Sequence, residues 1–212
     1  MRTCAQYKDL SLATLENKWG IAVLAFVVIC VVEIVVNLIA TQLGQGFGGQ
    51  GGASFFSCVF QILLLPLELG WAYVTLKLAR YNTPKVEDVF VGFKDYKRIF
   101  LTLLRKAIYI FLWSLLLIVP GIVKSYSYAM TEYLLIDNPQ LKYDAAITAS
   151  SQLMKGKKWD LFVLDLSFIG WAILCLVTCG IGFIFLAPYW RTARAHFYED
   201  LRAGSEVTVT YA

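Results

Sequence analysis

Long apolar runs, separated by shorter segments that carry most of the charge, are the main pattern along the chain. The first run extends from Trp19 to Ala40 and the second from Ala53 to Leu76. Each is long enough to cross a hydrocarbon layer of about 30 Å as an α-helix, which rises about 1.5 Å per residue. The pattern therefore predicts a membrane-spanning helix in each run.

Two further apolar stretches, Ile99–Ile136 and Leu161–Trp190, are too long for a single span. Turn-forming residues lie near their middles, Pro120-Gly121 in the first and Thr178-Cys179-Gly180 in the second. Each stretch is predicted to fold back on itself, so that the chain is all-α, with six transmembrane helices arranged as three hairpins. The predicted spans cover residues 19–41, 54–76, 99–119, 121–137, 160–178 and 180–197.

The composition supports a membrane protein and excludes a soluble domain. Hydrophobic residues make up 58% of the 212 residues and charged residues only 16%, with a mean hydropathy of +0.63. A soluble domain is nearer half apolar and a quarter charged, and a disordered chain is far less hydrophobic. We expect one polytopic membrane domain over residues 1–203 and a C-terminal tail over 204–212.

The basic residues predict the orientation. With six spans and a cytoplasmic N-terminus, every lysine and arginine except Lys124 falls on the inner side, in accord with the positive-inside rule. A four-span arrangement would place four lysines outside: Lys142, Lys155, Lys157 and Lys158. We therefore expect a multi-pass protein with both termini in the cytoplasm. The distribution of the basic residues therefore indicates that the net charge of +4 serves contact with a membrane surface and not with a nucleic acid.

A threefold pattern accompanies the hairpins. Each is preceded by an amphipathic basic segment, expected to be an interfacial helix on the cytoplasmic side: residues 7–20, 86–100 and 142–162, here called the lead-in segments. Each also has a proline in or near its returning helix, at Pro66, Pro120 and Pro188, where a kink is expected. These features suggest a threefold internal repeat. The alternative is that any set of hairpins with basic inner ends looks alike.

Two connections are interpreted from their glycines and prolines. Pro120-Gly121 is either a kink or the outer turn itself, and the hairpin over 99–137 is short enough to leave open whether it spans fully. The uncharged Gly44–Gly52 stretch is expected to be a flexible outer linker. It is not a phosphate-binding loop, because no Gly-Lys-Ser/Thr follows it.

Polar side chains within the apolar runs are the candidate site, because charged groups at bilayer depth are costly and usually face the bundle interior. The candidate intramembrane polar cluster consists of Glu33, Asn37, Glu68, Lys124, Glu132 and Asp165. One hypothesis makes Glu33, Glu68 and Asp165 a carboxylate site for a cation, a proton or a cationic headgroup. The other makes the carboxylates structural, paired with Lys124, Arg105 or Asn37. Lys106, Arg191 and Arg194 are interpreted as side chains that snorkel to the inner face.

Outside the spans, basic residues predict contact with anionic lipid headgroups on the cytoplasmic side. They are Lys94, Lys97, Arg98, Lys155, Lys157 and Lys158. No catalytic, metal or cofactor site is predicted. His196 is the single histidine, and Cys175 and Cys179 lack the further ligands that a metal site needs.

Three segments carry a family resemblance: LWSLLLIVPGIVKSYSYAMTEYLLIDNP, SSQLMKGKKWDLFVLDLSFIGW and LAPYWRTARAHFY. Together they resemble an uncharacterised bacterial family of integral membrane proteins, domain-of-unknown-function nine-seven-five, over roughly Leu10 to Leu201. The resemblance implies a multi-span helical protein of the bacterial cytoplasmic (inner) membrane. The resemblance does not imply any particular reaction, substrate or site residues.

Three functions are carried forward. The first is a non-enzymatic accessory or scaffold component that binds membrane lipids, or alternatively another membrane protein. The second is a small transporter or channel that uses the buried carboxylates. An intramembrane enzyme is third, because no nucleophile has an obvious base partner.

Overall fold

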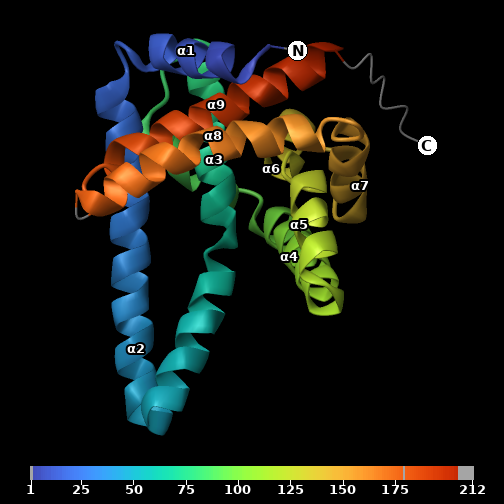
Figure 1. Ribbon diagram of the computed structural model, residues 1–212. Helices are drawn as coiled ribbons and strands as arrows, with labels where there is room; N and C mark the ends of the chain where they lie inside the picture. Colours follow the sequence, from blue (N-terminus) through green and yellow to red (C-terminus); the bar gives the residue numbers. More distant parts are fainter. Residues whose placement is uncertain (1, 179, 205–212) are drawn as a thin grey trace.

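The computed structural model describes residues 2–178 and 180–204, and every regular element in these residues is helical (Figure 1). The elements in chain order are α1 (Cys4–Leu15), α2 (Trp19–Leu63), α3 (Leu65–Ala79), the 3₁₀ helix η1 (Val86–Phe93), α4 (Tyr96–Leu116), α5 (Ile118–Ser127), α6 (Thr131–Asp137), α7 (Asp144–Leu153), α8 (Lys158–Val177) and α9 (Phe183–Gly204). The predicted all-α class is confirmed.

Three of the described helices, α2, α4 and α8, are long and apolar enough to cross a membrane. They cover the first predicted span and most of the third and fifth, and α2 also contains the first part of the second. The return of the second hairpin is divided into the short helices α5 and α6. The count of six spans therefore remains a prediction.

The glycine-rich stretch connects the first two predicted spans through a tight helical turn and not through an irregular loop. α2 continues through it, with non-helical backbone only at Gly48 (φ −170°, ψ 22°) and Gly49 (φ 63°, ψ −141°). The two arms touch at Gly44 and Gly52, where a Cβ on Gly44 would lie 2.4 Å from Ala53 Cα. The glycines thus allow the chain to reverse sharply and the two arms to meet without side chains between them.

The first hairpin returns through a break that the proline at Pro66 predicts. α2 ends at Leu63 and α3 begins at Leu65, which places Pro66 in the first turn of α3. Backbone N–H groups in the first turn make no hydrogen bond within the helix, so a proline is tolerated there. α3 is the most buried helix of this hairpin, and Trp71, Val74 and Leu78 on it belong to the apolar core.

In the second hairpin the outer turn lies at Leu117, whose backbone is extended (φ −158°, ψ 142°). Pro120 lies in the first turn of α5, so it neither forms the turn nor kinks a helix interior. Gly121 permits close approach of the two helices, because a Cβ there would lie 2.8 Å from Ser114 Cα. α4 and α5 pack against each other and form a shorter projection than the α2–α3 hairpin (Figure 1).

The third hairpin turns between α8 and α9, where Gly180 has φ 84°; Cys179 lies outside the described residues. α9 crosses α2 and α3, with both of which it is in contact, and contains Pro188 within its length (Figure 1). The three hairpins thus differ in length and direction, and the threefold repeat stays a prediction. The proposed tail after Gly204 also lies outside the described residues.

The first two lead-in segments pack closely onto other helices. α1 buries Tyr7, Ser11, Thr14 and Leu15, which lie on one helical face, and contacts α9. η1 lies against α3, where a Cβ on Gly70 would be 1.7 Å from the Val89 carbonyl oxygen.

The third lead-in segment is anchored by a buried serine on α7. Ser150 Oγ donates to the Ser127 carbonyl at 3.0 Å and accepts from the Met130 N–H at 3.2 Å. It thereby holds the break between α5 and α6.

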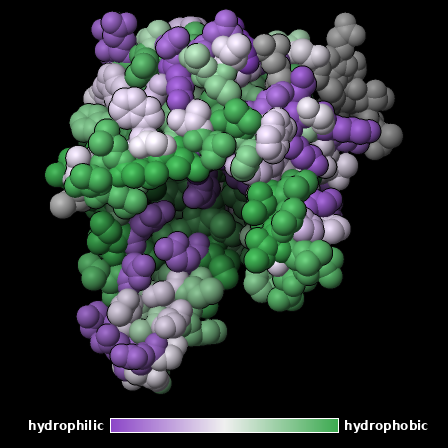
Figure 2. All heavy atoms as spheres, in the orientation of Figure 1, coloured by the Kyte–Doolittle hydropathy of each residue, from purple (hydrophilic) through white to green (hydrophobic). Residues whose placement is uncertain are grey.

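The surface divides along the long axis of the molecule. Hydrophilic surface is concentrated at the end that carries α1 and α7 and again at the tip of α2, with much hydrophobic surface between them (Figure 2). Large exposed apolar side chains are frequent on this middle region, including Leu38 on α2, Leu116 on α4 and Ile173 on α8. Such exposure fits a chain surrounded by lipid.

Candidate functional site

The six residues of the predicted polar cluster do not assemble into one site. Glu68 and Glu132 line a cavity of about 400 Å³, here called the central cavity. Asp165 lines a neighbouring cavity of about 480 Å³, here called the side cavity. Glu33, Asn37 and Lys124 line neither of the two.

The central cavity lies among the hairpins. α3, α4, α5, α6 and α9 each contribute to its wall, and the charged side chains in the wall are Glu68, Lys106, Glu132, Arg191 and Arg194. The space-filling view shows a hollow between the α2–α3 and α4–α5 hairpins with hydrophilic surface at its inner end (Figure 2). A polar cavity therefore lies beside surfaces that are mainly apolar.

Glu132 and Lys106 form the most buried ion pair of the cavity. Glu132 is 8% exposed, and its Oε1 accepts from Lys106 Nζ at 2.5 Å. α6 places Glu132 and α4 places Lys106, so the pair joins the two sides of the second hairpin. Each charge of this pair depends on the other, because removing one side chain would leave the opposite charge buried without a counter-ion.

Glu68 and Arg191 form the second pair. Arg191 Nη2 donates to Glu68 Oε2 at 2.6 Å, which joins α9 to the first turn of α3. The Glu68 side chain is half exposed, whereas that of Arg191 is 18% exposed. The guanidinium is therefore enclosed by the protein while its carboxylate partner is open to the cavity.

Arg194 marks the border of the two cavities, since it lines both, as does Tyr126. It donates to Asp165 through Nε at 3.0 Å and through Nη2 at 2.5 Å. The Trp190 indole N–H donates to the same carboxylate at 2.8 Å, and the Trp190 ring lies 4.5 Å from the guanidinium carbon. Two hydrogen bonds and a stacked ring fix this arginine in one orientation.

The three remaining residues of the predicted cluster have separate surroundings. Asn37 accepts from Ser57 Oγ at 3.2 Å, which links the two arms of α2. Lys124 lies over the Trp113 ring, 4.7 Å from its centre. Glu33 lies on α2, and its carboxylate is close enough to that of Glu68 to repel it.

The partners of the carboxylates are the residues that sequence reasoning missed. Lys106, Arg191 and Arg194 were predicted to snorkel, but each pairs with a carboxylate at a cavity wall. Glu68 and Asp165 thus pair with Arg191 and Arg194, and not with the partners suggested from the sequence, which were Lys124, Arg105 and Asn37. One signal was available: Arg191 and Arg194 are three residues apart and share a face of α9.

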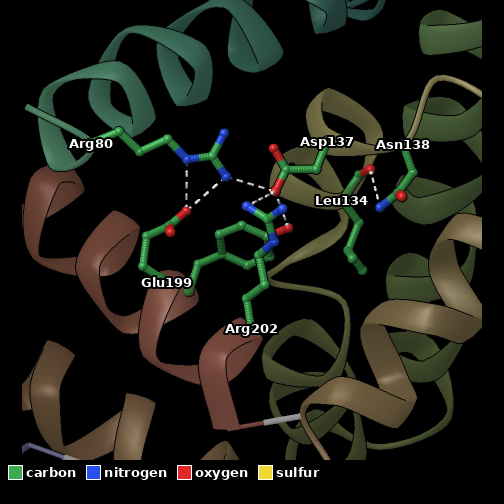
Figure 3. A network of polar contacts seen from close by, with 7 residues as sticks. Arg80, Leu134, Asp137, Asn138, Glu199 and Arg202 are labelled. Atoms are coloured by element: carbon green, nitrogen blue, oxygen red, sulfur yellow. Dashed lines mark hydrogen bonds and ion pairs between the residues drawn. The ribbon is translucent and has the colours of Figure 1, made fainter. Parts of the chain in front are cut away.

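A second polar network lies at the ends of α3, α6 and α9, outside the three helices that are long and apolar enough to span (Figure 3). Asp137 accepts from Arg80 Nη2 at 2.7 Å and from Tyr198 Oη at 2.8 Å, and Arg202 Nη1 is 3.3 Å away. Arg80 also donates to Glu199 at 2.9 Å. The network ties the ends of three helices together.

Electrostatics within this network favour a charged Asp137, a charged Arg80 and a neutral Tyr198. Burial would raise the pKa of Asp137, but hydrogen bonds from Arg80 and Tyr198 and the nearby positive charges hold it below its ordinary value. The same hydrogen bond to Asp137 raises the pKa of Arg80. Burial and the Asp137 charge raise the pKa of Tyr198, so the phenol stays protonated and donates.

The predicted interfacial basic residues line neither the central nor the side cavity, but Lys155 and Lys158 line a third cavity of about 490 Å³. Lys94, Lys97 and Lys155 are exposed. Arg98 is part-buried and donates to the Leu141 carbonyl at 3.1 Å, and Lys157 is 3.9 Å from Asp160. Lys158 lies in the first turn of α8.

Within residues 2–178 and 180–204, no three His, Cys, Asp or Glu side chains are grouped closely enough to hold a metal ion. His196 is buried, and its Nε2 lies 2.9 Å from Thr14 Oγ1, so it joins α9 to α1.

Comparison with known proteins gives one family. The model of the family described as "Protein of unknown function (DUF975)" matches residues 1–124 and 115–205. No curated protein and no solved structure matches the chain.

Proposed function

The chain belongs to the DUF975 family of proteins of unknown function, and on this premise we propose that it is a non-enzymatic integral membrane protein that binds a phospholipid headgroup in the central cavity. The observation that carries the proposal is the set of ion pairs in a cavity that lies beside mainly apolar hairpins. Charged groups at such a place are costly unless they serve a partner.

The hydrogen-bond donors suit a phosphate. Each of the three bases in the wall of the central cavity is paired with a carboxylate, so recognition depends on N–H groups that these pairs leave available. A guanidinium has five N–H donors, and Arg191 and Arg194 use only some of theirs in their hydrogen bonds to Glu68 and Asp165. The remaining donors match the oxygens of a phosphodiester.

Lipid is the source of phosphate that fits the surroundings. The apolar side chains at the cavity wall include Leu103, Ala107 and Ile110 on α4. A headgroup that enters from the bilayer side keeps its chains in apolar surroundings, whereas a free hydrophilic ligand has no such preference.

The membrane arrangement belongs to the same proposal. We place the three hairpins in the bacterial cytoplasmic membrane with both termini in the cytoplasm. Because α5 is only ten residues long, the second hairpin enters the membrane without crossing it fully. The lysines and arginine of the interfacial set then meet anionic headgroups at the inner surface. Enrichment of basic residues at one side supports this orientation.

A transporter that uses buried carboxylates is the competing function. Glu68, Glu132 and Asp165 each have a basic partner within 2.6 Å, which favours fixed recognition of a ligand over a free cation site. A proton or ion flux in reconstituted vesicles that is abolished by Glu68→Gln and Glu132→Gln would establish the transporter instead.

The experiment that tests lipid binding is native mass spectrometry of the full chain in detergent, titrated with phosphatidylglycerol, phosphatidylethanolamine or diacylglycerol of the same chains. We expect the phospholipids to be retained over diacylglycerol, and Arg191→Gln to remove this preference. Lys94→Gln is the matched control, because it removes the same charge from an exposed position. Equal retention of all three lipids, or an unchanged preference in Arg191→Gln, would refute the proposal.

A further inference from the structure

The side cavity is built mostly from apolar side chains. Its wall comes from α5, α8 and α9, with Leu166, Ile169 and Ala172 on one side and Phe183 and Leu186 on another. Leu166 and Ile169 in this wall are 50% and 49% exposed, so the space of about 480 Å³ is a groove that opens between the helices. The cavity is therefore a space that an apolar molecule can fill.

The side cavity adjoins the central cavity. Tyr126 and Arg194 line both, so the two spaces share a border made by α5 and α9. Tyr126 is held by an edge-on contact with Phe162, at 5.7 Å between ring centres, and Arg194 is held by Asp165 and Trp190. The border is thus formed by oriented side chains.

The carboxylate of the side cavity already has hydrogen-bond partners. Asp165 accepts from both Arg194 and the Trp190 indole. Beyond these residues the wall offers apolar surface, and water in such a space finds too few partners to be well bound. A hydrophilic occupant is therefore disfavoured along the length of the cavity.

We infer that the side cavity holds one acyl chain of the phospholipid whose headgroup occupies the central cavity. This inference rests on the proposed function and adds to it that the ligand is recognised at both its phosphate and its chain. Charge at the shared border and apolar surface beyond it match the two parts of an amphipathic lipid.

A peptide helix is a poorer occupant. An α-helix with side chains is about 10–12 Å across, so a groove of about 480 Å³ holds little more than one turn of it. An extended hydrocarbon chain is much narrower than a helix. The dimensions therefore favour an acyl chain over a segment of a partner protein.

The test is photo-crosslinking with a phosphatidylglycerol that carries a diazirine in one acyl chain, applied to the full chain in vesicles, with labelled peptides mapped by mass spectrometry. We expect label on the 166–172 segment of α8 and near Leu186 of α9. Ala172→Trp fills the side cavity and is expected to lose this label. Ile173→Trp is the matched control, because Ile173 is exposed and does not line the cavity.

The outcomes separate the two proposals. Label confined to exposed apolar residues such as Leu38 and Leu116, with phosphate-dependent lipid retention intact, would overturn the acyl-chain site and leave headgroup binding standing. Equal labelling by a diacylglycerol probe without phosphate would instead overturn headgroup binding. If Ala172→Trp fails to fold, Ile169→Trp on the same wall provides the second variant, and unchanged labelling in it overturns the inference.

Discussion

Arg194 on α9 donates to both carboxylate oxygens of Asp165 on α8, at 3.0 and 2.5 Å, where the central and side cavities meet. The pair fastens the third hairpin, and it also orients the guanidinium whose remaining donors border the central cavity. One contact thus has a structural role and a proposed binding role.

The structural role predicts a loss of stability in Asp165→Asn. The Arg194 and Asp165 side chains are 19% and 13% exposed, and removing one partner leaves the other poorly compensated. We expect the free energy of unfolding to fall by about 2–3 kcal/mol. Thermal unfolding in detergent checks this, with Asp160→Asn as the control, because its pair with Lys157 is exposed and is worth about 1 kcal/mol or less. Equal losses in the two variants would contradict the prediction.

Ser150→Ala is expected to destabilise the break between α5 and α6. The buried hydroxyl bonds both the Ser127 carbonyl and the Met130 N–H, and its removal leaves buried backbone groups without that partner. The expected loss is about 1–3 kcal/mol. Ser151→Ala changes the next residue, which is only part-buried, and should leave the unfolding temperature nearly unchanged.

Gly70→Ala is expected to separate η1 from α3. The added Cβ would lie 1.7 Å from the Val89 carbonyl oxygen, so backbone must move. Overpacking of this kind costs about 1–3 kcal/mol. Gly20→Ala is the control, because a Cβ there has no neighbour within 4 Å. Circular dichroism on heating measures both, and a stable Gly70→Ala variant would contradict the packing described here.

Acid should weaken the Arg80–Asp137–Tyr198 network. Because the folded-state pKa of Asp137 lies below its ordinary value, its contribution is complete above about pH 4 and is lost as the pH falls through that lower pKa. We therefore expect Asp137→Asn to melt below the wild type at pH 7, with the gap narrowing on acidification. Asp95→Asn, at a largely exposed carboxylate, should show little gap at either pH.

Orientation is tested by cysteine labelling in a variant without native cysteines. Gln45→Cys at the tip of α2 and Lys157→Cys before α8 should react from opposite sides of the membrane in intact cells. Labelling of both positions from the same side would contradict the proposed topology.

The sequence alone determined the helical class, the apolar runs and the concentration of basic residues in the segments between them. These depend on composition and on residues a few positions apart, so a local pattern is sufficient to predict them. It also supplied the family motifs around Pro120 and Gly156. It did not give the turn at Leu117 or the close approach of Gly44 and Gly52, because these depend on how two helices fit against each other.

The candidate site was decided by tertiary structure. Three of the four carboxylates that sequence analysis singled out pair with a base on another helix, and the partners Glu68 and Arg191 are 123 residues apart. An apolar run shows that a charge is costly at its position, but it does not show which distant charge compensates it. That choice depends on how the hairpins pack, because Coulomb attraction and hydrogen bonding act over a few ångströms in space and not along the sequence.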